Sequence, residues 1–364
     1  MSTLVGVVLL AALTAYAVFG GADFGAGFWD LTAGGPGRGA RPRELIDRSI
    51  GPVWEGNHVW LIFVFVVTWT AFPEAYASIM LTLFVPLTIA AIGIVLRGAG
   101  FAFRKAVVSL RNRRLFGAAF AASSVVVPYC MGTVAGGIAS GRVPAGGKAG
   151  DPVDSWVNPT SIVAGLLAAA AVAYLSAVYL VWAARRDHDD ELARYFRLRA
   201  VVSAVVVAGV SVVGLVVLHN DARYVFDGMT GRALPVVAVG VGCGIGALVL
   251  LALDATRGGR LLAVVAVASL VVAWGVAQWP YLLPKSLTVS AAAAPSGTLN
   301  ALVVAVVLAA LIVLPGFVLL YVLVQRQLLP EEGVGDVADR GPGVPLAGAP
   351  AAGTSSASGD APPQ

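Results

Sequence analysis

Long apolar runs separated by short polar segments are the most regular feature of the chain. Each run holds about 18 residues or more, enough for an α-helix to cross about 30 Å of hydrocarbon. The pattern predicts nine membrane-spanning helices, over residues 3–30, 54–72, 77–97, 115–139, 160–183, 200–219, 234–253, 261–279 and 298–325. The expected fold is therefore an all-α, multi-pass membrane protein.

The two ends of the chain need separate interpretation. The first run contains Ala15-Tyr16-Ala17, which resembles a signal-peptide cleavage site, but no basic residue precedes the run and the apolar pattern continues beyond this point. We interpret it as a retained span. After residue 330 the chain is rich in Pro, Gly, Ala and Ser and has no hydrophobic period, as in disordered segments. We predict a transmembrane helical domain over 1–330 and a disordered cytoplasmic tail over 331–364.

Composition excludes a sizeable soluble domain, because 58% of the residues are apolar and only 12% are charged, against about 25% charged in soluble domains. The net charge of +4 does not indicate a nucleic-acid partner, since the basic residues lie between the spans. Most of the 24 lysines and arginines follow the first, third, fifth and seventh spans or lie in the tail. The positive-inside rule therefore predicts an outside N-terminus and a cytoplasmic C-terminus.

Four ionisable residues converge at one predicted depth of the first three spans. Asp23 lies about 20 residues along the first span, or about 30 Å at 1.5 Å per residue, near the cytoplasmic boundary. Glu55 and His58 begin the second span and share one helix face, and Arg97 ends the third. An ionisable group within a membrane favours a functional interpretation. We predict a proton-handling or ligand-contact site; ordinary interfacial residues, or an ion cluster that ties helices together, are the alternatives.

Other candidate sites have weaker support from the sequence. Trp54, beside Glu55, could stack on a flat ligand such as a quinone, although most tryptophans here lie near predicted span boundaries, where such side chains anchor helices. Asp187, His188 and Asp189 are adjacent in the sequence and would face different ways on a helix. We therefore predict no metal site in this chain.

Six segments together resemble subunit II of the cytochrome bd-type quinol oxidases. They are residues 16–27 (YAVFGGADFGAG), 49–62 (SIGPVWEGNHVWLI), 71–73 (AFP), 96–98 (LRG), 101–104 (FAFR) and 295–300 (PSGTLN). Their order and spacing match the family across nearly the whole chain except the tail. The stretch around Trp54 and Glu55 is specific, whereas each of the others alone would be weak.

The resemblance implies two four-helix bundles plus a peripheral helix, and a heterodimer with subunit I in the bacterial plasma membrane. Subunit I would carry two haems b, haem d and the quinol-oxidising loop, so this chain would contribute no catalytic residue. The complex would oxidise menaquinol or ubiquinol and reduce oxygen to water with cytoplasmic protons, and a small accessory subunit could accompany it. The histidine inventory agrees, because three histidines at membrane edges or in a loop are ill suited to holding three haems.

The family also implies roles for single residues. Glu55 would lie on a proton path between the subunits, and the position of Asp23 is characteristic. Trp54 matches a residue near a structural quinone. We expect Asp23, His58 and Arg97 to set the proton affinity of Glu55.

Three points keep other interpretations open. Many family members carry an acid where this chain has Ala102, so a relay that used that carboxylate would need water or another residue. A proton-coupled secondary transporter also uses buried acids, but tends to have broken helices at the bilayer midplane, whereas the polar residues here cluster at one face. A purely structural assembly subunit is not separable from the oxidase interpretation by sequence.

Overall fold

The computed structural model describes residues 1–364 except 36, 51–53, 107–109 and 326–364. The chain divides into a large unit, Met1–Tyr321, and a second unit, Val322–Gln364. Of the second unit the structure describes only residues 322–325, so the predicted tail over 331–364 lies outside the described residues.

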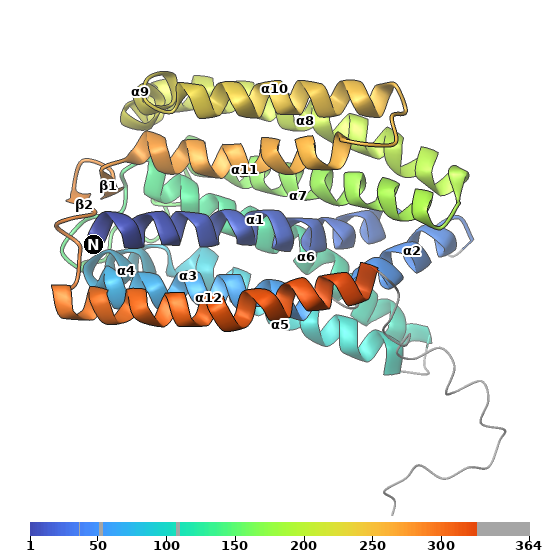
Figure 1. Cartoon of the computed structure of the whole chain (residues 1–364), viewed down its shortest axis with the longest axis horizontal. Helices are drawn as coiled ribbons and strands as arrows, with labels where there is room; N and C mark the ends of the chain where they lie inside the picture. The colour runs from blue at the N-terminus through green and yellow to red at the C-terminus, as the bar shows by residue number, and fades with distance from the viewer. Residues whose placement is uncertain (36, 51–53, 107–109, 326–364) are drawn as a thin grey trace, which may run out of the picture. The chain divides into compact units, whose positions relative to one another are not determined.

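Nine long apolar helices correspond in order to the nine predicted spans (Figure 1). They are α1 (Ser2–Thr32), α3 (Trp54–Ala71), α5 (Phe84–Ala106), α6 (Leu110–Ala139), α7 (Pro159–Arg186), α8 (Asp190–Asp221), α10 (Leu234–Ala252), α11 (Gly259–Gln278) and α12 (Ser296–Gln325). In the described residues, eight helices are long and apolar enough to cross a membrane, and the apolar part of α3 is shorter. The all-α, multi-pass prediction is confirmed.

Short elements join the long helices. They are α2 (Ala40–Ile50), α4 (Pro73–Thr82), α9 (Arg223–Thr230) and the antiparallel pair β1 (Tyr281–Leu283) and β2 (Leu287–Thr288). Helix α2 is amphipathic, with Leu45 and Ile46 buried against the core and charged residues on its other face. The sequence pattern did not predict it.

The third predicted span, 77–97, is wrong at its start. The chain leaves helical geometry at Leu83, so α4 ends there and the long helix α5 begins at Phe84. The cause is Pro86, which has no N–H to donate to the carbonyl of Thr82 and whose ring clashes with that carbonyl in a continuous helix. The freed carbonyl of Thr82 instead accepts a hydrogen bond from the hydroxyl of Ser155, at 3.4 Å.

The charged segment from Arg185 to Arg199, which its sequence indicates is a solvated helix end, is mostly helical in the structure. Helix α7 extends to Arg186 and α8 starts at Asp190. The side chain of Asp189 caps α8 by accepting a hydrogen bond from the N–H of Leu192, at 3.0 Å. The charged residues therefore form helix ends that project beyond the apolar spans.

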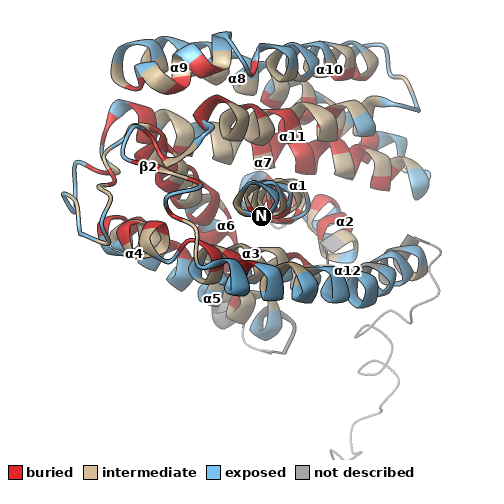
Figure 2. Cartoon of the chain, turned by 60° about the vertical axis from the view of Figure 1, so that its left-hand side comes forward, coloured by how far each residue is buried: buried red, intermediate tan, exposed pale blue. Residues whose placement is uncertain are grey.

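Helix α1 lies at the centre of the large unit and packs against α3, α6, α7 and α11. Figure 2, which looks nearly along α1, shows α7 and α11 on one side of it and α3, α6 and α12 on the other. The remaining main contacts join α5 to α6, α7 to α8, and α10 to α11. Because α1 and α6 also pack against α7, the described contacts do not divide cleanly, and the arrangement as two four-helix bundles stays a prediction.

The outer helices expose the apolar residues that a membrane would cover (Figure 2). Val212 of α8, Ile245 of α10 and Ile312 of α12 are among many large apolar side chains on the surface. Apolar surface of this extent is unusual on a water-soluble monomer. It is expected of helices that face lipid or a partner subunit.

The two ends of the large unit differ in charge. One end, here called the basic end, holds α2, the α7–α8 connection and the α10–α11 connection, with Arg41, Arg48, Arg185 and Arg257 among its residues. The other end holds the N-terminus, α4, α9 and the β1–β2 pair (Figure 1). The membrane orientation of these ends stays a prediction.

Candidate functional site

A buried ion pair joins α1 to α5 near the basic end. The Nη2 atom of Arg97 lies 2.7 Å from Oδ1 of Asp23 and donates a second hydrogen bond to the backbone carbonyl of Asp23, at 3.1 Å. Both side chains are almost fully buried, with 1% of Arg97 and 2% of Asp23 exposed. The sequence predicted that Asp23 of the first span and Arg97 of the third lie at one depth. In the structure these two side chains form an ion pair.

Aromatic rings and a hydroxyl complete the surroundings of the guanidinium. Its Cζ atom lies 4.7 Å from the ring centre of Phe24 and 4.9 Å from that of Phe120, a range in which cation–π attraction operates. The Nε atom of Arg97 donates to the hydroxyl of Ser124, at 3.1 Å. Among the described residues, the charge is held by the carboxylate and the backbone carbonyl of Asp23, the hydroxyl of Ser124 and two ring faces.

Glycines of α1 allow neighbouring helices to approach closely enough to bury this pair. A Cβ atom at Gly25 would overlap the carbonyl oxygen of Val172 in α7 and lie 2.7 Å from Cβ of Ser176. A Cβ atom at Gly27 would overlap the hydroxyl of Ser124 in α6. Close approach through small residues is typical of helix pairs in membranes. Here it places α6 and α7 directly against the helix that carries Asp23.

Two buried oxygen atoms beside the pair lack hydrogen-bond partners among the described residues. They are Oδ2 of Asp23 and the hydroxyl oxygen of Tyr16. Tyr16 precedes Asp23 by two helical turns and so lies on the same face of α1. Buried polar atoms are normally satisfied by protein or water. This part of the site therefore has hydrogen-bonding capacity that its described neighbours do not use.

The second predicted span contributes His58 to the same region. The imidazole ring of His58 lies 6.1 Å from the ring of Phe24, centre to centre, and Phe24 in turn contacts Arg97. His58 is half-buried, and Asn57 beside it is buried. Three of the four predicted site residues, Asp23, Arg97 and His58, thus lie around one phenylalanine.

The side chains of Glu55 and Trp54 lie outside the described residues. The backbone places both in the first turn of α3, one turn before His58. Ala102 is exposed on α5, five residues after Arg97. The predicted roles of Glu55 and Trp54 therefore stay predictions.

Sequence reasoning missed the α6 side of the site. Ser124 and Phe120 both contact Arg97, yet the fourth predicted span was interpreted only as an apolar helix. The adjacent serines Ser123 and Ser124 are a polar interruption in that run. That interruption was the available signal.

Ion pairs tie α2 to the α7–α8 connection at the basic end. Arg41 lies 2.8 Å from Asp189 and 2.5 Å from Glu191, and Arg48 lies 3.5 Å from Asp187. The hydrogen bond from the N–H of Leu192, with those from Arg41, holds the pKa of Asp189 below its usual range. The carboxylates near His188 thus bind arginines of α2.

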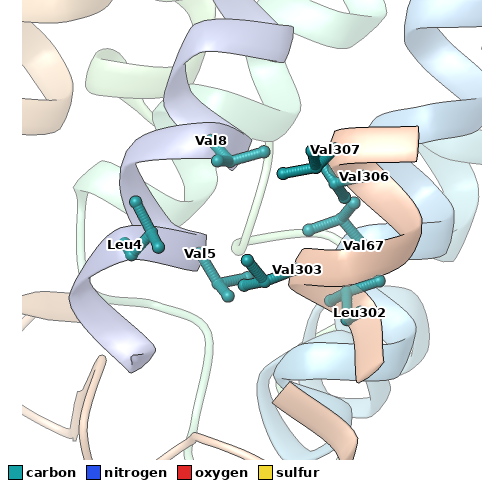
Figure 3. A pocket seen from close by; sticks show the side chains of 8 residues that line it. All are labelled: Leu4, Val5, Val8, Val67, Leu302, Val303, Val306 and Val307. Atoms are coloured by element: carbon teal, nitrogen blue, oxygen red, sulfur yellow. The ribbon is translucent and has the colours of Figure 1, made fainter. Parts of the chain in front are cut away.

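The small apolar cavity between α1, α3 and α12 offers no ligand for a haem iron. One apolar cavity of about 90 Å³ lies between α1, α3 and α12 and is lined only by valines and leucines (Figure 3). It is small beside ligand pockets of about 300–1,000 Å³. Haem iron is held by His, Met, Cys or Tyr, and none of these lines this cavity or a larger one between α7, α10 and α11. We therefore derive no chemical step through a haem in this chain.

The fold and the buried site define a multi-pass helical membrane protein with a charge pair enclosed between its first helices. The family model for cytochrome bd terminal oxidase subunit II matches residues 1–324. The chain therefore belongs to the subunit II family of the cytochrome bd terminal oxidases, and it is a multi-pass protein of the bacterial plasma membrane. The resemblance drawn from the sequence motifs is confirmed.

Individual relatives agree with this assignment. The chain is 28% identical over 189 residues to cytochrome bd-I ubiquinol oxidase subunit 2 of Escherichia coli K12, a match that covers 49% of this chain and 46% of the relative. It is 26% identical over 147 residues to cytochrome bd ubiquinol oxidase subunit 2 of Bacillus subtilis, covering 40% and 43%. The chain thus spans about half the length of these curated relatives.

A solved structure extends the similarity to most of the fold. A chain of the bd oxidase from Geobacillus thermodenitrificans superposes with a TM-score of 0.68 at 25% identity. The match covers 88% of this chain and 97% of that one. The helical architecture is therefore shared over nearly the whole length.

Proposed function

We propose that this chain is the second subunit of a quinol-oxidising bd-type terminal oxidase. In this proposal it scaffolds a haem-bearing subunit I and supplies a route for cytoplasmic protons, while the complex transfers electrons from quinol to oxygen and forms water. The family match over residues 1–324 supports the assignment. The subunit alone would not be catalytic.

The observation that carries the proton role is the buried pair of Asp23 and Arg97. Placing two charges in a membrane interior is costly unless they compensate each other, and the guanidinium does compensate one carboxylate oxygen. The other oxygen, Oδ2, is buried without a partner among the described residues. An acceptor of this kind can hold a water molecule or receive a proton that enters from the basic end.

Glu55 would deliver the proton in this scheme. It lies in the first turn of α3, one turn before His58, and His58 contacts Phe24 beside Asp23. Residues three apart on a helix share one face. Glu55 would thus pass protons from the cytoplasmic side inward, and Asp23, His58 and Arg97 would set its proton affinity.

Replacing Glu55 by Gln tests the route. We expect slower quinol-driven oxygen uptake with unchanged assembly and haem content, because the amide keeps the shape but does not exchange a proton at neutral pH. Glu44→Gln is the matched control, since Glu44 is an exposed carboxylate of α2 at the same end. Wild-type turnover of Glu55→Gln with haems present would refute the proton role, and loss of haem would make Glu55 a structural residue.

Purification through a tag on the C-terminal tail tests the assignment itself. We expect a larger partner with b- and d-type haem signals in the reduced-minus-oxidised spectrum, together with quinol-driven oxygen uptake. Comparing menaquinol with ubiquinol identifies the electron donor, and the subunit content of the preparation reports any small accessory subunit. A colourless preparation without that partner would contradict the oxidase proposal and favour the proton-coupled transporter, to be tested by uptake into vesicles.

A further inference from the structure

A cavity of about 270 Å³ opens at the basic end between α7, α10 and α11. It lies away from the Asp23–Arg97 pair, and its walls come from the last turns of α7 and α10, the α10–α11 connection and the first turn of α11. Its volume is close to the lower limit of about 300 Å³ for ligand pockets. Three arginines line it: Arg185, Arg257 and Arg260.

Two of these arginines have capacity for an anion. The Nη1 atom of Arg260 is buried without a hydrogen-bond partner among the described residues, and its guanidinium lies over the ring of Trp182, 4.5 Å from the centre. Arg257 is exposed and forms no ion pair with a described residue. Arg185, by contrast, is already bound to Asp254 and to the carbonyl of Ala255.

The backbone adds further donors at the same place. Helix α11 has 20 residues and starts at Gly259, after Gly258, which has a positive φ of 87° and provides no side-chain cap. Its first N–H groups are therefore free of a capping side chain. Uncapped N–H groups together with the positive end of the helix dipole favour a phosphate. The sequence Arg257-Gly258-Gly259-Arg260 places two cations around these groups.

The apolar part of the cavity indicates which phosphate compound fits. Val178, Val181, Leu250 and Leu251 line the cavity along α7 and α10. Leu261, which also lines the cavity, is 68% exposed on the outer surface of α11. A free phosphate would gain nothing from this surface, whereas a phospholipid could place its headgroup among the arginines and its acyl chains along α10 and α11.

We propose that this cavity binds the phosphate of an anionic phospholipid, with Arg257, Arg260 and the start of α11 as its ligands. Trp182 holds the guanidinium of Arg260 in place by stacking. Basic pockets between transmembrane helices on the cytoplasmic side are suited to such headgroups. The proposal is independent of the proton route.

Native mass spectrometry of the purified, delipidated complex tests the site. Phosphatidylglycerol or cardiolipin is titrated in, with phosphatidylcholine as the zwitterionic comparison and inorganic phosphate as the soluble one. We expect tight, saturable binding of one anionic lipid. The variant Arg257→Gln/Arg260→Gln should bind that lipid about 30-fold more weakly, which corresponds to about 1 kcal/mol per arginine.

The matched control is Arg38→Gln/Arg194→Gln. It removes two exposed arginines from the same end but outside the cavity, so lipid binding should stay within about twofold. Arg257→Gln alone, about fivefold weaker by the same constant, serves where the double variant fails to assemble. Equal binding of phosphatidylcholine, equal loss in the control, or saturation by inorganic phosphate with no preference for lipid would each overturn the proposal.

Discussion

Replacing either Asp23 or Arg97 alone should destabilise the protein strongly. Replacing both residues together should destabilise it less than either single change. Asp23→Asn removes the carboxylate charge that lies 2.7 Å from the guanidinium and leaves a cation that is 1% exposed. Arg97→Met keeps a long apolar side chain but leaves the carboxylate without its cation. Each single variant therefore leaves one buried charge without its ion-pair partner among the described residues.

The expected magnitude follows from the burial of the pair. Removing one partner of a buried ion pair costs about 3–5 kcal/mol, whereas replacing both is often close to neutral. The double variant Asp23→Asn/Arg97→Met should therefore lose less stability than either single variant. The resulting interaction energy should be about 3 kcal/mol or more, well above the typical scatter of about 0.3–0.5 kcal/mol for independent sites.

The measurement is a double-mutant cycle on the free energy of unfolding, followed by tryptophan fluorescence during titration with a denaturing detergent. The exposed pair of Arg223 and Asp227 at the other end of the bundle, 56% and 58% exposed, provides the control cycle. Its interaction energy should be about 0.5 kcal/mol or less. Additive losses in the Asp23–Arg97 cycle would refute the reasoning, because they would mean that the charges do not compensate each other.

Two further predictions concern packing and pH. Gly25→Ala should lower the free energy of unfolding by about 1–3 kcal/mol or more, because overpacking forces backbone shifts. Gly242→Ala is the control, because nothing lies within 4 Å of its added Cβ, and it should gain up to about 1 kcal/mol from helix propensity. Equal thermal stability of the two variants would contradict this prediction. The lowered pKa of Asp189 stabilises the folded state above the unfolded pKa of about 3.9, and this contribution is lost as pH falls through the folded value. The protection of the first amides of α8 against hydrogen exchange, relative to their intrinsic exchange rate at each pH, should therefore fall below about pH 4 in the wild type but not in Asp189→Asn, which keeps the helix cap. Equal pH dependence of the protection in both proteins would exclude this role for Asp189.

The long helices could be predicted because a bilayer imposes one requirement on every span. About 20 apolar residues must follow one another, and this requirement does not depend on tertiary contacts. The error in the third span occurred where a local signal was overlooked. Pro86 interrupts the helical hydrogen bonds before Phe84.

For the site residues, the sequence could predict only their depth along the helices. Counting 1.5 Å per residue placed Asp23 and Arg97 at one level, and the structure joins them. Depth says nothing of how each helix is rotated about its axis, so it could not show that Asp23 is a partner of Arg97. It also could not reveal Ser124, whose position depends on how α6 packs against α1.

The glycines of α1 explain why the Asp23–Arg97 pair is buried. Without a side chain at Gly25 and Gly27, α7 and α6 approach the backbone of α1 closely, and this close approach buries the ion pair. The low exposure of Asp23 and Arg97 is therefore a property of the packing and not of the two residues themselves. It follows that a bulkier residue at Gly27 should weaken the pair through Ser124, the hydroxyl that holds Arg97, even though α3 and Glu55 are not touched. A proton route that depended on Glu55 alone would be indifferent to that change, whereas one that uses the buried oxygen of Asp23 would be slowed by it.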